Sequence, residues 1–203
     1  MTIAQQRQIA HTIAALYHDA KNDHFKMMKG VAKSMFRPIH PNDFKNVYLS
    51  ISHQQGEDLT QLIQRNNFKN IVEFGTSFGI STLFLAQGAM ETGGHIITTE
   101  LIESKALRAI ENFKRAGVRQ LIEVRIGDAL QTLRPHSSPI DLLLLDGWKD
   151  LYLPLFQMLE PNFHSHTVIY VDNADMSETQ AFLRRVSENG RYHLQSYYRG
   201  KVV

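Results

Sequence analysis

From Lys69 to the end of the chain, segments with the apolar pattern of buried strands alternate with segments of helical periodicity. Strict alternation of this kind predicts a parallel sheet with helices on both faces. Two continuous apolar runs, Leu142–Leu145 and Val168–Val171, support this, because strands covered on both faces need no polar alternation. Right-handed crossovers would bring the carboxyl ends of the strands to one edge, where ligands bind in such sheets. We expect strands over 69–74, 94–100, 120–126, 140–146, 166–172 and 191–198, and helices over 80–91, 103–116, 129–134, 150–160 and 177–189.

The first third of the chain has the pattern of helices joined by a connector. Apolar side chains recur at helical spacing from residue 3 to about residue 29, and a second helix is expected over 58–66. Between them, Pro38 and Pro41 break any helix, so this segment is either a plain connector or a lid over a site. A chain of 203 residues suits one domain, with residues 1–66 as an N-terminal helical extension and residues 67–203 as the core.

Composition argues against several classes of protein. The chain has no cysteine, which rules out disulfides and thiolate metal sites. Its net charge of +2 gives no reason to expect a nucleic-acid partner. No apolar run reaches the ~20 residues of a membrane span, and the N-terminus lacks the pattern of a signal peptide, so a cytoplasmic protein is expected.

The segment Ile71–Ser81 combines a buried strand, a turn with two glycines and the start of a helix. Such a unit presents backbone N–H groups to a ligand, and Gly75 and Gly79 would let the backbone approach it closely. The spacing is E-x-G-x-x-x-G, whereas a dinucleotide fold has G-x-G-x-x-G around a pyrophosphate. Glu73 is unfavourable beside a diphosphate, which argues against an NAD-dependent oxidoreductase, and it suits a cationic or hydrogen-bond-donating ligand. From this segment alone, a nucleoside-type site and an ordinary turn both stay open.

Acidic or amide side chains stand at five successive strand ends: Glu73, Glu100, Asp128, Asp146 and the pair Asp172–Asn173. A single acid at such a place is commonly a helix cap. Five together favour a ligand site, since capping needs only one short polar residue. Glu100 follows the glycine turn at about 20–25 residues, the separation at which an acid reaches a ribose diol in nucleoside-binding sheets.

The sharpest group is Asp146, Asp172 and Asn173, whose hard oxygen atoms at adjacent strand ends suit Mg²⁺ or Ca²⁺. Asp–Asn pairs also form turns, so a purely structural reading stays open. Lys149 would lie near this group, where positive charge and partial desolvation would lower its pKa and make it usable as a base. Taken alone, Lys149 is better explained as a solvated surface lysine in the first turn of a helix, and Trp148 could be core or could stack on an adenine.

Taken together, the segments Glu73–Ser81, Leu145–Pro154 and Asp172–Asn173, with Glu100, resemble class I S-adenosylmethionine (SAM)-dependent O-methyltransferases of the catechol O-methyltransferase type. The most discriminating part is D-x-W-K-D-x-Y-L-P, which begins at Asp146. The resemblance covers roughly residues 49–198 and implies a Rossmann-like, doubly wound, mostly parallel sheet.

The resemblance also implies a role for each residue of the site. The glycine turn would hold the methionine part of SAM, and Glu100 would hold the ribose hydroxyls. Lys149 would be the general base, and Asp146, Asp172 and Asn173 would hold Mg²⁺ or another divalent cation. The residues expected to contact the cofactor are Leu49, Ile51, Glu73, Gly75, Thr76, Ser77, Gly79, Ser81, Glu100, Leu101, Asp128, Ala129, Asp146 and Trp148.

Two features depart from the family pattern. Gly147 replaces the side chain, usually a histidine, that follows the metal aspartate. The sequence stops at Val203, so the last strand is expected to be short or absent, and no counterpart of the catechol enzyme's substrate-binding glutamate is found.

The implied function is transfer of a methyl group from SAM to a hydroxyl of a small acceptor, catechol-like or a vicinal diol, with help from a divalent metal. The alternatives are a metal-independent SAM-dependent methyltransferase and a SAM-binding protein without activity. Neither nucleic acid nor a membrane is expected as a partner. The oligomeric state stays open, with a homodimer as one of the outcomes.

Overall fold

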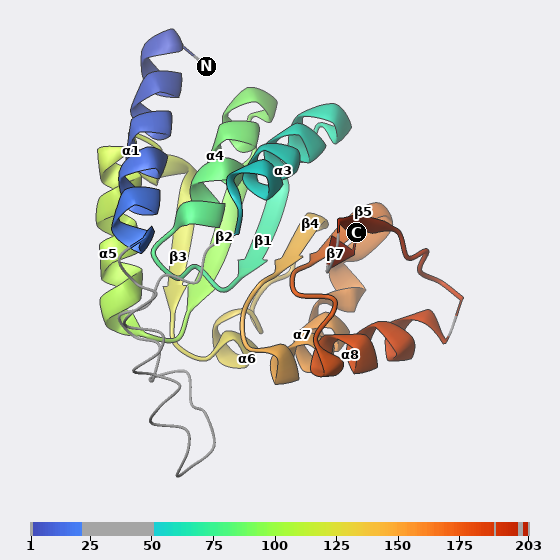
Figure 1. Ribbon diagram of the computed structural model, residues 1–203. Helices are drawn as coiled ribbons and strands as arrows, with labels where there is room; N and C mark the ends of the chain where they lie inside the picture. The colour runs from blue at the N-terminus through green and yellow to red at the C-terminus, as the bar shows by residue number, and fades with distance from the viewer. Residues whose placement is uncertain (1, 22–50, 189, 199–200, 203) are drawn as a thin grey trace.

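The computed structural model describes residues 2–21, 51–188, 190–198 and 201–202, and these build one mixed sheet with helices on both faces (Figure 1). The strands occur in the order β3-β2-β1-β4-β5-β7-β6. The first five in sequence run parallel, while β7 is antiparallel to both β5 and β6. The strands are β1 (Asn70–Phe74), β2 (His95–Glu100), β3 (Ile122–Ile126), β4 (Ile140–Leu145), β5 (Phe163–Val171), β6 (Ser196–Tyr198) and β7 (Lys201–Val202). The expected doubly wound, mostly parallel sheet is therefore confirmed.

The helices divide between the two faces of the sheet. They are α1 (Ile3–Lys21), α3 (His53–Asn66), α4 (Ile80–Thr92), α5 (Glu103–Arg115), α6 (Ala129–Thr132), α7 (Tyr152–Leu159) and α8 (Ser177–Ser187). One apolar cluster joins α1, α3, α4 and α5 to one face, and a second joins α6, α7 and α8 to the other (Figure 1). Because α1 and α3 contribute fully buried side chains such as Ile9 and Ile63 to the first cluster, the helical extension shares the core of the sheet. None of the helices in the described ranges is both long and apolar enough to cross a bilayer.

Most predicted elements occur within a few residues of their expected bounds, and two differ more. The helix expected to begin at residue 58 begins at His53, because Ser52 and Gln55 form a capping box: the Ser52 hydroxyl accepts from the Gln55 backbone N–H, and the Gln55 side chain accepts from the Ser52 N–H. The strand expected over 191–198 is wrong for 191–195; only Ser196–Tyr198 forms a strand, paired with the two-residue β7. The expectation of a short last strand is confirmed. The part of the first expected helix beyond residue 21 and the connector with Pro38 and Pro41 lie outside the described residues.

The order of the strands creates a crevice between β1 and β4. From β1 the chain crosses to β2 on one side, and it later returns to place β4 on the other side of β1. The β4–β5 register pairs Leu145 with Val171, so Asp146 and Asp172 follow paired ends of neighbouring strands. Ligands bind at such a reversal of strand order, outside the carboxyl ends of the strands.

At the opposite edge of the sheet, Asp141 ties three strands together. One carboxylate oxygen accepts the backbone N–H groups of Lys69 and Asn70 at 2.7 and 2.8 Å, and the other lies 3.0 Å from His164 Nε2. Burial raises the pKa of Asp141, but the two backbone donors and His164 outweigh it, so the pKa lies below its usual range.

Replacement of Asp141 by Asn is expected to lower the free energy of unfolding by about 1–2 kcal/mol at pH 7, because a charged acceptor is lost. A depressed folded-state pKa means that the carboxylate stabilises fully above its unfolded pKa of about 3.9, and that this stabilisation is lost as the pH falls through the folded pKa. The difference between wild type and Asp141→Asn in urea unfolding should therefore shrink below about pH 4. A difference that stayed constant down to pH 2 would contradict this account.

Candidate active site

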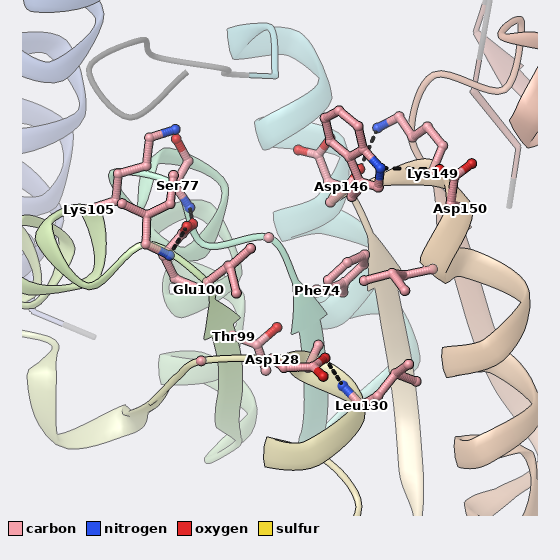
Figure 2. A pocket seen from close by; sticks show the side chains of 18 of the residues that line it. Phe74, Ser77, Thr99, Glu100, Lys105, Asp128, Leu130, Asp146, Lys149 and Asp150 are labelled. Carbon is pink, nitrogen blue, oxygen red and sulfur yellow. Dashed lines mark hydrogen bonds between the residues drawn. The ribbon is translucent and has the colours of Figure 1, made fainter. Parts of the chain in front are cut away.

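A cavity of about 680 Å³ opens at the carboxyl ends of β1, β2, β3 and β4, on the crevice described above (Figure 2). It brings together residues that are as much as 99 positions apart in the chain, Phe74 and Asn173. The predicted site residues that line it are Gly75, Ser77, Glu100, Leu101, Asp128, Ala129, Asp146, Trp148, Lys149 and Asn173.

Of the two glycines of the turn, Gly75 borders the cavity and Gly79 does not. Gly75 has φ +108°, and a Cβ there would lie 2.7 Å from the carbonyl oxygen of Asp146. Gly79 has φ +90°, and a Cβ there would lie 2.4 Å from the ring of Phe113 on α5. Gly79 therefore serves the packing of helix on helix, and only Gly75 lets the backbone approach a ligand.

The carboxylate of Glu73, which we expected to contact the cofactor, is used inside the protein. The residue is 0% exposed, and its oxygens accept hydrogen bonds of 2.5, 2.5 and 2.6 Å from the hydroxyls of Ser81, Thr82 and Thr98. Burial raises the pKa of Glu73, while the three hydroxyl donors act in the opposite direction. The Glu73 carboxylate therefore does not face the cavity; it joins β1, β2 and the first turn of α4.

Three further described residues of the expected cofactor set, Ser81, Thr76 and Ile51, do not line the cavity. Ser81 is occupied with Glu73, and the fully buried Thr76 places its hydroxyl 2.6 Å from that of Thr98. Ile51 is 4% exposed and belongs to the apolar core of α1 and α3. Leu49 lies outside the described residues.

Glu100 stands at the end of β2 with both oxygens held by backbone donors (Figure 2). Oε2 accepts from Ser77 N at 2.8 Å and Oε1 from Ile102 N at 2.9 Å. Burial raises the pKa of Glu100, while these donors and the charge of Lys105 lower it, and burial has the larger effect. Carboxylate oxygens have further lone pairs, so Glu100 can still accept hydrogen bonds from a diol.

Lys105 was not among the expected site residues, although it lines the same cavity. It lies on the buried face of α5 with only 4% of its surface exposed, and its Nζ is 5.3 Å from the ring centroid of Phe78.

Substitution Lys105→Met should weaken binding of S-adenosylhomocysteine (SAH) on the acidic side of neutrality. Loss of the neighbouring cation raises the pKa of Glu100 further, so the carboxylate becomes protonated at a higher pH.

The measurement is the SAH dissociation constant between pH 5 and 8. The pH below which SAH affinity falls should be higher in Lys105→Met than in wild type. Lys114 is a solvent-exposed lysine of the same helix, so the control variant Lys114→Met should have the pH profile of wild type. Identical pH profiles for Lys105→Met and wild type would refute a role of Lys105 at Glu100.

Asp128 follows β3 at the entrance of α6, next to the cavity. Its Oδ1 accepts from Leu130 N at 2.9 Å, so the ordinary role of an acid after a strand, helix capping, applies to this residue. Trp148 also lines the cavity, and it donates from Nε1 to Asp150 Oδ2 at 3.2 Å. The flat indole and the capping turn thus border the same space.

Lys149 lines the cavity, and its Nζ is held by two acceptors. It donates to the carbonyl oxygen of Gly147 at 3.0 Å and to the Tyr152 hydroxyl at 2.9 Å. Tyr152 is 0% exposed and itself donates to the Leu145 carbonyl at 2.9 Å. Burial lowers the pKa of Lys149, and the charge of Asp146 only partly opposes it. Because its pKa is lowered, Lys149 is neutral, and able to accept a proton, at a lower pH than an exposed lysine.

The candidate metal ligands also come together. Asp146 and Asn173 line the cavity, and Asp172 is buried beside them with its N–H donating to the Leu145 carbonyl. No group of three or more His, Cys, Asp or Glu side chains suited to a metal occurs in the described ranges, so a metal here would rest on two carboxylates and one amide oxygen. That donor set consists of hard oxygens alone and fits Mg²⁺, which retains several waters.

Comparison with known proteins agrees with this geometry. A family model described as O-methyltransferase matches residues 22–179. The chain belongs to the O-methyltransferase family. It is 33% identical over 129 residues to a catechol O-methyltransferase of Niastella koreensis, covering 62% of this chain and 58% of that protein. It is 35% identical over 126 residues to a catechol O-methyltransferase of Mycobacterium tuberculosis, covering 62% and 57%. The matches thus span under two thirds of these two relatives.

A solved O-methyltransferase structure supports the same assignment. The protein from Bacillus cereus in complex with SAH is 26% identical to this O-methyltransferase family member, with a TM-score of 0.63 over 88% of this chain and 86% of that one. The class I methyltransferase fold implied by the sequence is therefore confirmed.

The departure from the family pattern at Gly147 has a structural reason. A Cβ at Gly147 would lie 2.5 Å from the ring of Phe74, which fills the space that a side chain would take. Phe74 lines the cavity and was not expected there, since it reads as an ordinary strand residue. Besides Phe74 and Lys105, the sequence analysis missed six lining residues, all of them apolar, small or common in loops. They are Thr99, Ile102, Gly127, Leu130, Asp150 and Leu151.

Proposed function

We propose that this O-methyltransferase transfers the methyl group of SAM to a hydroxyl of a small acceptor, with a divalent metal bound beside the acceptor. One observation carries the proposal: Lys149, Asp146 and Asn173 line the same cavity as Gly75 and Glu100. A base and an oxygen-rich cation site thus face a nucleoside-type cofactor site across one space. A protein that only bound SAM would not need them.

Within the cavity each group has a defined task. Gly75 lets the cofactor lie against the backbone, and Glu100 accepts hydrogen bonds from the ribose hydroxyls. Lys149 removes the proton of the acceptor hydroxyl. A phenol has a pKa of about 10, so a phenolic acceptor is largely protonated at neutral pH and needs such a base. Asp146, Asp172 and Asn173 would hold a divalent cation, whose positive charge would lower the pKa of the acceptor hydroxyl. Transfer then depends on holding both reactants in line.

We further propose an acceptor with two neighbouring oxygens, such as a catechol or another vicinal diol. The two relatives described above are both named catechol O-methyltransferase, and a cation held by three protein oxygens keeps positions open for two acceptor oxygens.

A second candidate is a metal-independent SAM-dependent methyltransferase. The observation in its favour is that the candidate cation site holds only two carboxylates in the described residues, one of which already accepts a hydrogen bond from Gln55. Lys149 alone would then deprotonate the acceptor.

The deciding experiment is isothermal titration calorimetry of SAH, followed by titration of a catechol into the SAH complex with Mg²⁺ and with EDTA. We expect SAH to bind in both conditions and the catechol to bind only with Mg²⁺. Catechol binding that is equal in EDTA would favour the metal-independent enzyme. Absence of SAH binding would refute the proposed function as a whole.

A further inference from the structure

One hydrogen bond links the first turn of α3 to the candidate cation site at the other end of the sequence. Gln55 Nε2 donates to Asp172 Oδ1 at 3.3 Å, across 117 positions of the chain. Asp172 is a buried carboxylate, 5% exposed, and Gln55 is half-buried beside it. Nothing in the sequence pattern around Gln55 points to the cation site, because its spacing from Ser52 is that of a common helix cap.

The amide of Gln55 can take only one orientation. Its oxygen accepts from Ser52 N at 2.9 Å, which leaves its NH₂ group to face Asp172. A flipped amide would set the NH₂ group against the Ser52 N–H and the amide oxygen against the carboxylate, and both contacts would be repulsive. The capping box therefore fixes a hydrogen-bond donor at Asp172.

We propose that Gln55 is a positioning residue for the cation site, holding the Asp172 carboxylate in the orientation that a divalent cation requires. This inference rests on the proposed function, since it needs a cation at Asp146, Asp172 and Asn173. A neutral donor suits the task, because it restrains the carboxylate without neutralising its charge. Hydrogen bonds to metal-ligating carboxylates have this effect in other sites, and their loss typically lowers metal affinity by about 10–100-fold.

The proposal also makes the start of α3 sensitive to the cation. A cation that holds Asp172 strengthens the orientation of the Gln55 amide, whose oxygen accepts the Ser52 N–H. Hydrogen exchange of the Ser52 amide should therefore slow when Mg²⁺ is added. This readout does not depend on turnover.

The test is calorimetric titration of Mg²⁺ into the SAH complex of wild type, Gln55→Leu and Ser52→Ala. Ser52→Ala is the matched control: it removes the Ser52 hydroxyl from the capping box but keeps the Ser52 N–H, the Gln55 amide and its contact with Asp172. We expect Mg²⁺ affinity to fall about 10-fold or more in Gln55→Leu and to change less than about twofold in Ser52→Ala. SAH affinity should stay the same in all three, and Mg²⁺ should slow exchange of the Ser52 amide only where Gln55 is present.

Equal Mg²⁺ affinity in Gln55→Leu and wild type would overturn the positioning role while leaving the metal-dependent function intact. An equal loss in Ser52→Ala would overturn it as well, since helix capping alone would then explain the effect. Wild type that binds SAH but no Mg²⁺ would refute the metal and this inference together, and would leave the methyltransferase proposal standing. If Gln55→Leu does not fold, Gln55→Met, which keeps the length of the side chain, is measured in its place.

Discussion

Replacement of Lys149 by Met is expected to lower kcat by a factor of about 10²–10⁴, the usual contribution of a general base, while SAH binds as in wild type. Met keeps the unbranched apolar stem that crosses the cavity wall, so the change removes the amine and its two hydrogen bonds but little packing. The measurement is single-turnover methyl transfer to the catechol used in the calorimetric titration.

The pH dependence of kcat gives a second readout of the same residue. Because burial lowers the pKa of Lys149, the neutral amine is populated at a lower pH than for an ordinary lysine. In wild type, kcat should rise with pH through this lowered pKa and then level off, and this rise should be absent in Lys149→Met. The exposed Lys114→Met should behave as wild type. A Lys149→Met enzyme with full kcat would exclude Lys149 as the base.

Replacement of Gly75 by Ala is expected to abolish measurable SAH binding and to lower the melting temperature. A Cβ at Gly75 would lie 2.7 Å from Asp146 O and 2.9 Å from Asp146 C and Gly147 N. All three are backbone atoms at the end of β4, so no side-chain rotation relieves the contact, and β1 must move from β4 at the crevice. The left-handed φ of +108° adds about 1–2 kcal/mol of backbone strain.

Gly93→Ala separates the two causes. Gly93, at the end of α4, also has a left-handed φ, +70°, but nothing lies within 4 Å of its Cβ position. This variant should show only the loss of stability from strain, with unchanged SAH affinity. Calorimetry with SAH and thermal melting of both variants are the measurements. Normal SAH binding by Gly75→Ala would show that the approach of β1 and β4 at this point does not shape the cofactor site.

The sequence predicted which edge of the sheet carries the site better than it predicted the contacts of individual side chains. Five acids at strand ends located the functional edge of the sheet, because parallel strands place their carboxyl ends together whatever the packing. Which of these acids faces the cavity depends on the side of the strand and on local donors, and periodicity does not contain that information. Glu73 and Glu100 end neighbouring strands, yet three hydroxyls enclose Glu73 while Glu100 borders the cavity.

The residues missed from the sequence share a cause. Lys105 and Gln55 lie on helices, where a charged or amide side chain normally faces solvent, and both reach the site only because their helices pack at its rim. The Phe74 ring on β1 fills the space that a side chain at Gly147, after β4, would occupy. A pattern within one segment of the sequence does not reveal such packing between two strands. Short-range signals therefore predicted the elements, whereas the lining of the site depends on tertiary packing.

The glycine turn between β1 and α4 is held entirely by groups of the protein itself. Gly75 N and Thr76 N both donate to Thr99 O, at 3.2 and 3.0 Å, Gly79 N donates to Thr76 O, and Ser77 N donates to Glu100. The turn is therefore held in one conformation by the protein itself, so ordering it on cofactor association should cost little chain entropy. Cofactor association should therefore leave the conformation of this turn unchanged. Hydrogen exchange of the Gly75, Thr76 and Gly79 amides should then be equally slow in the free and the bound protein.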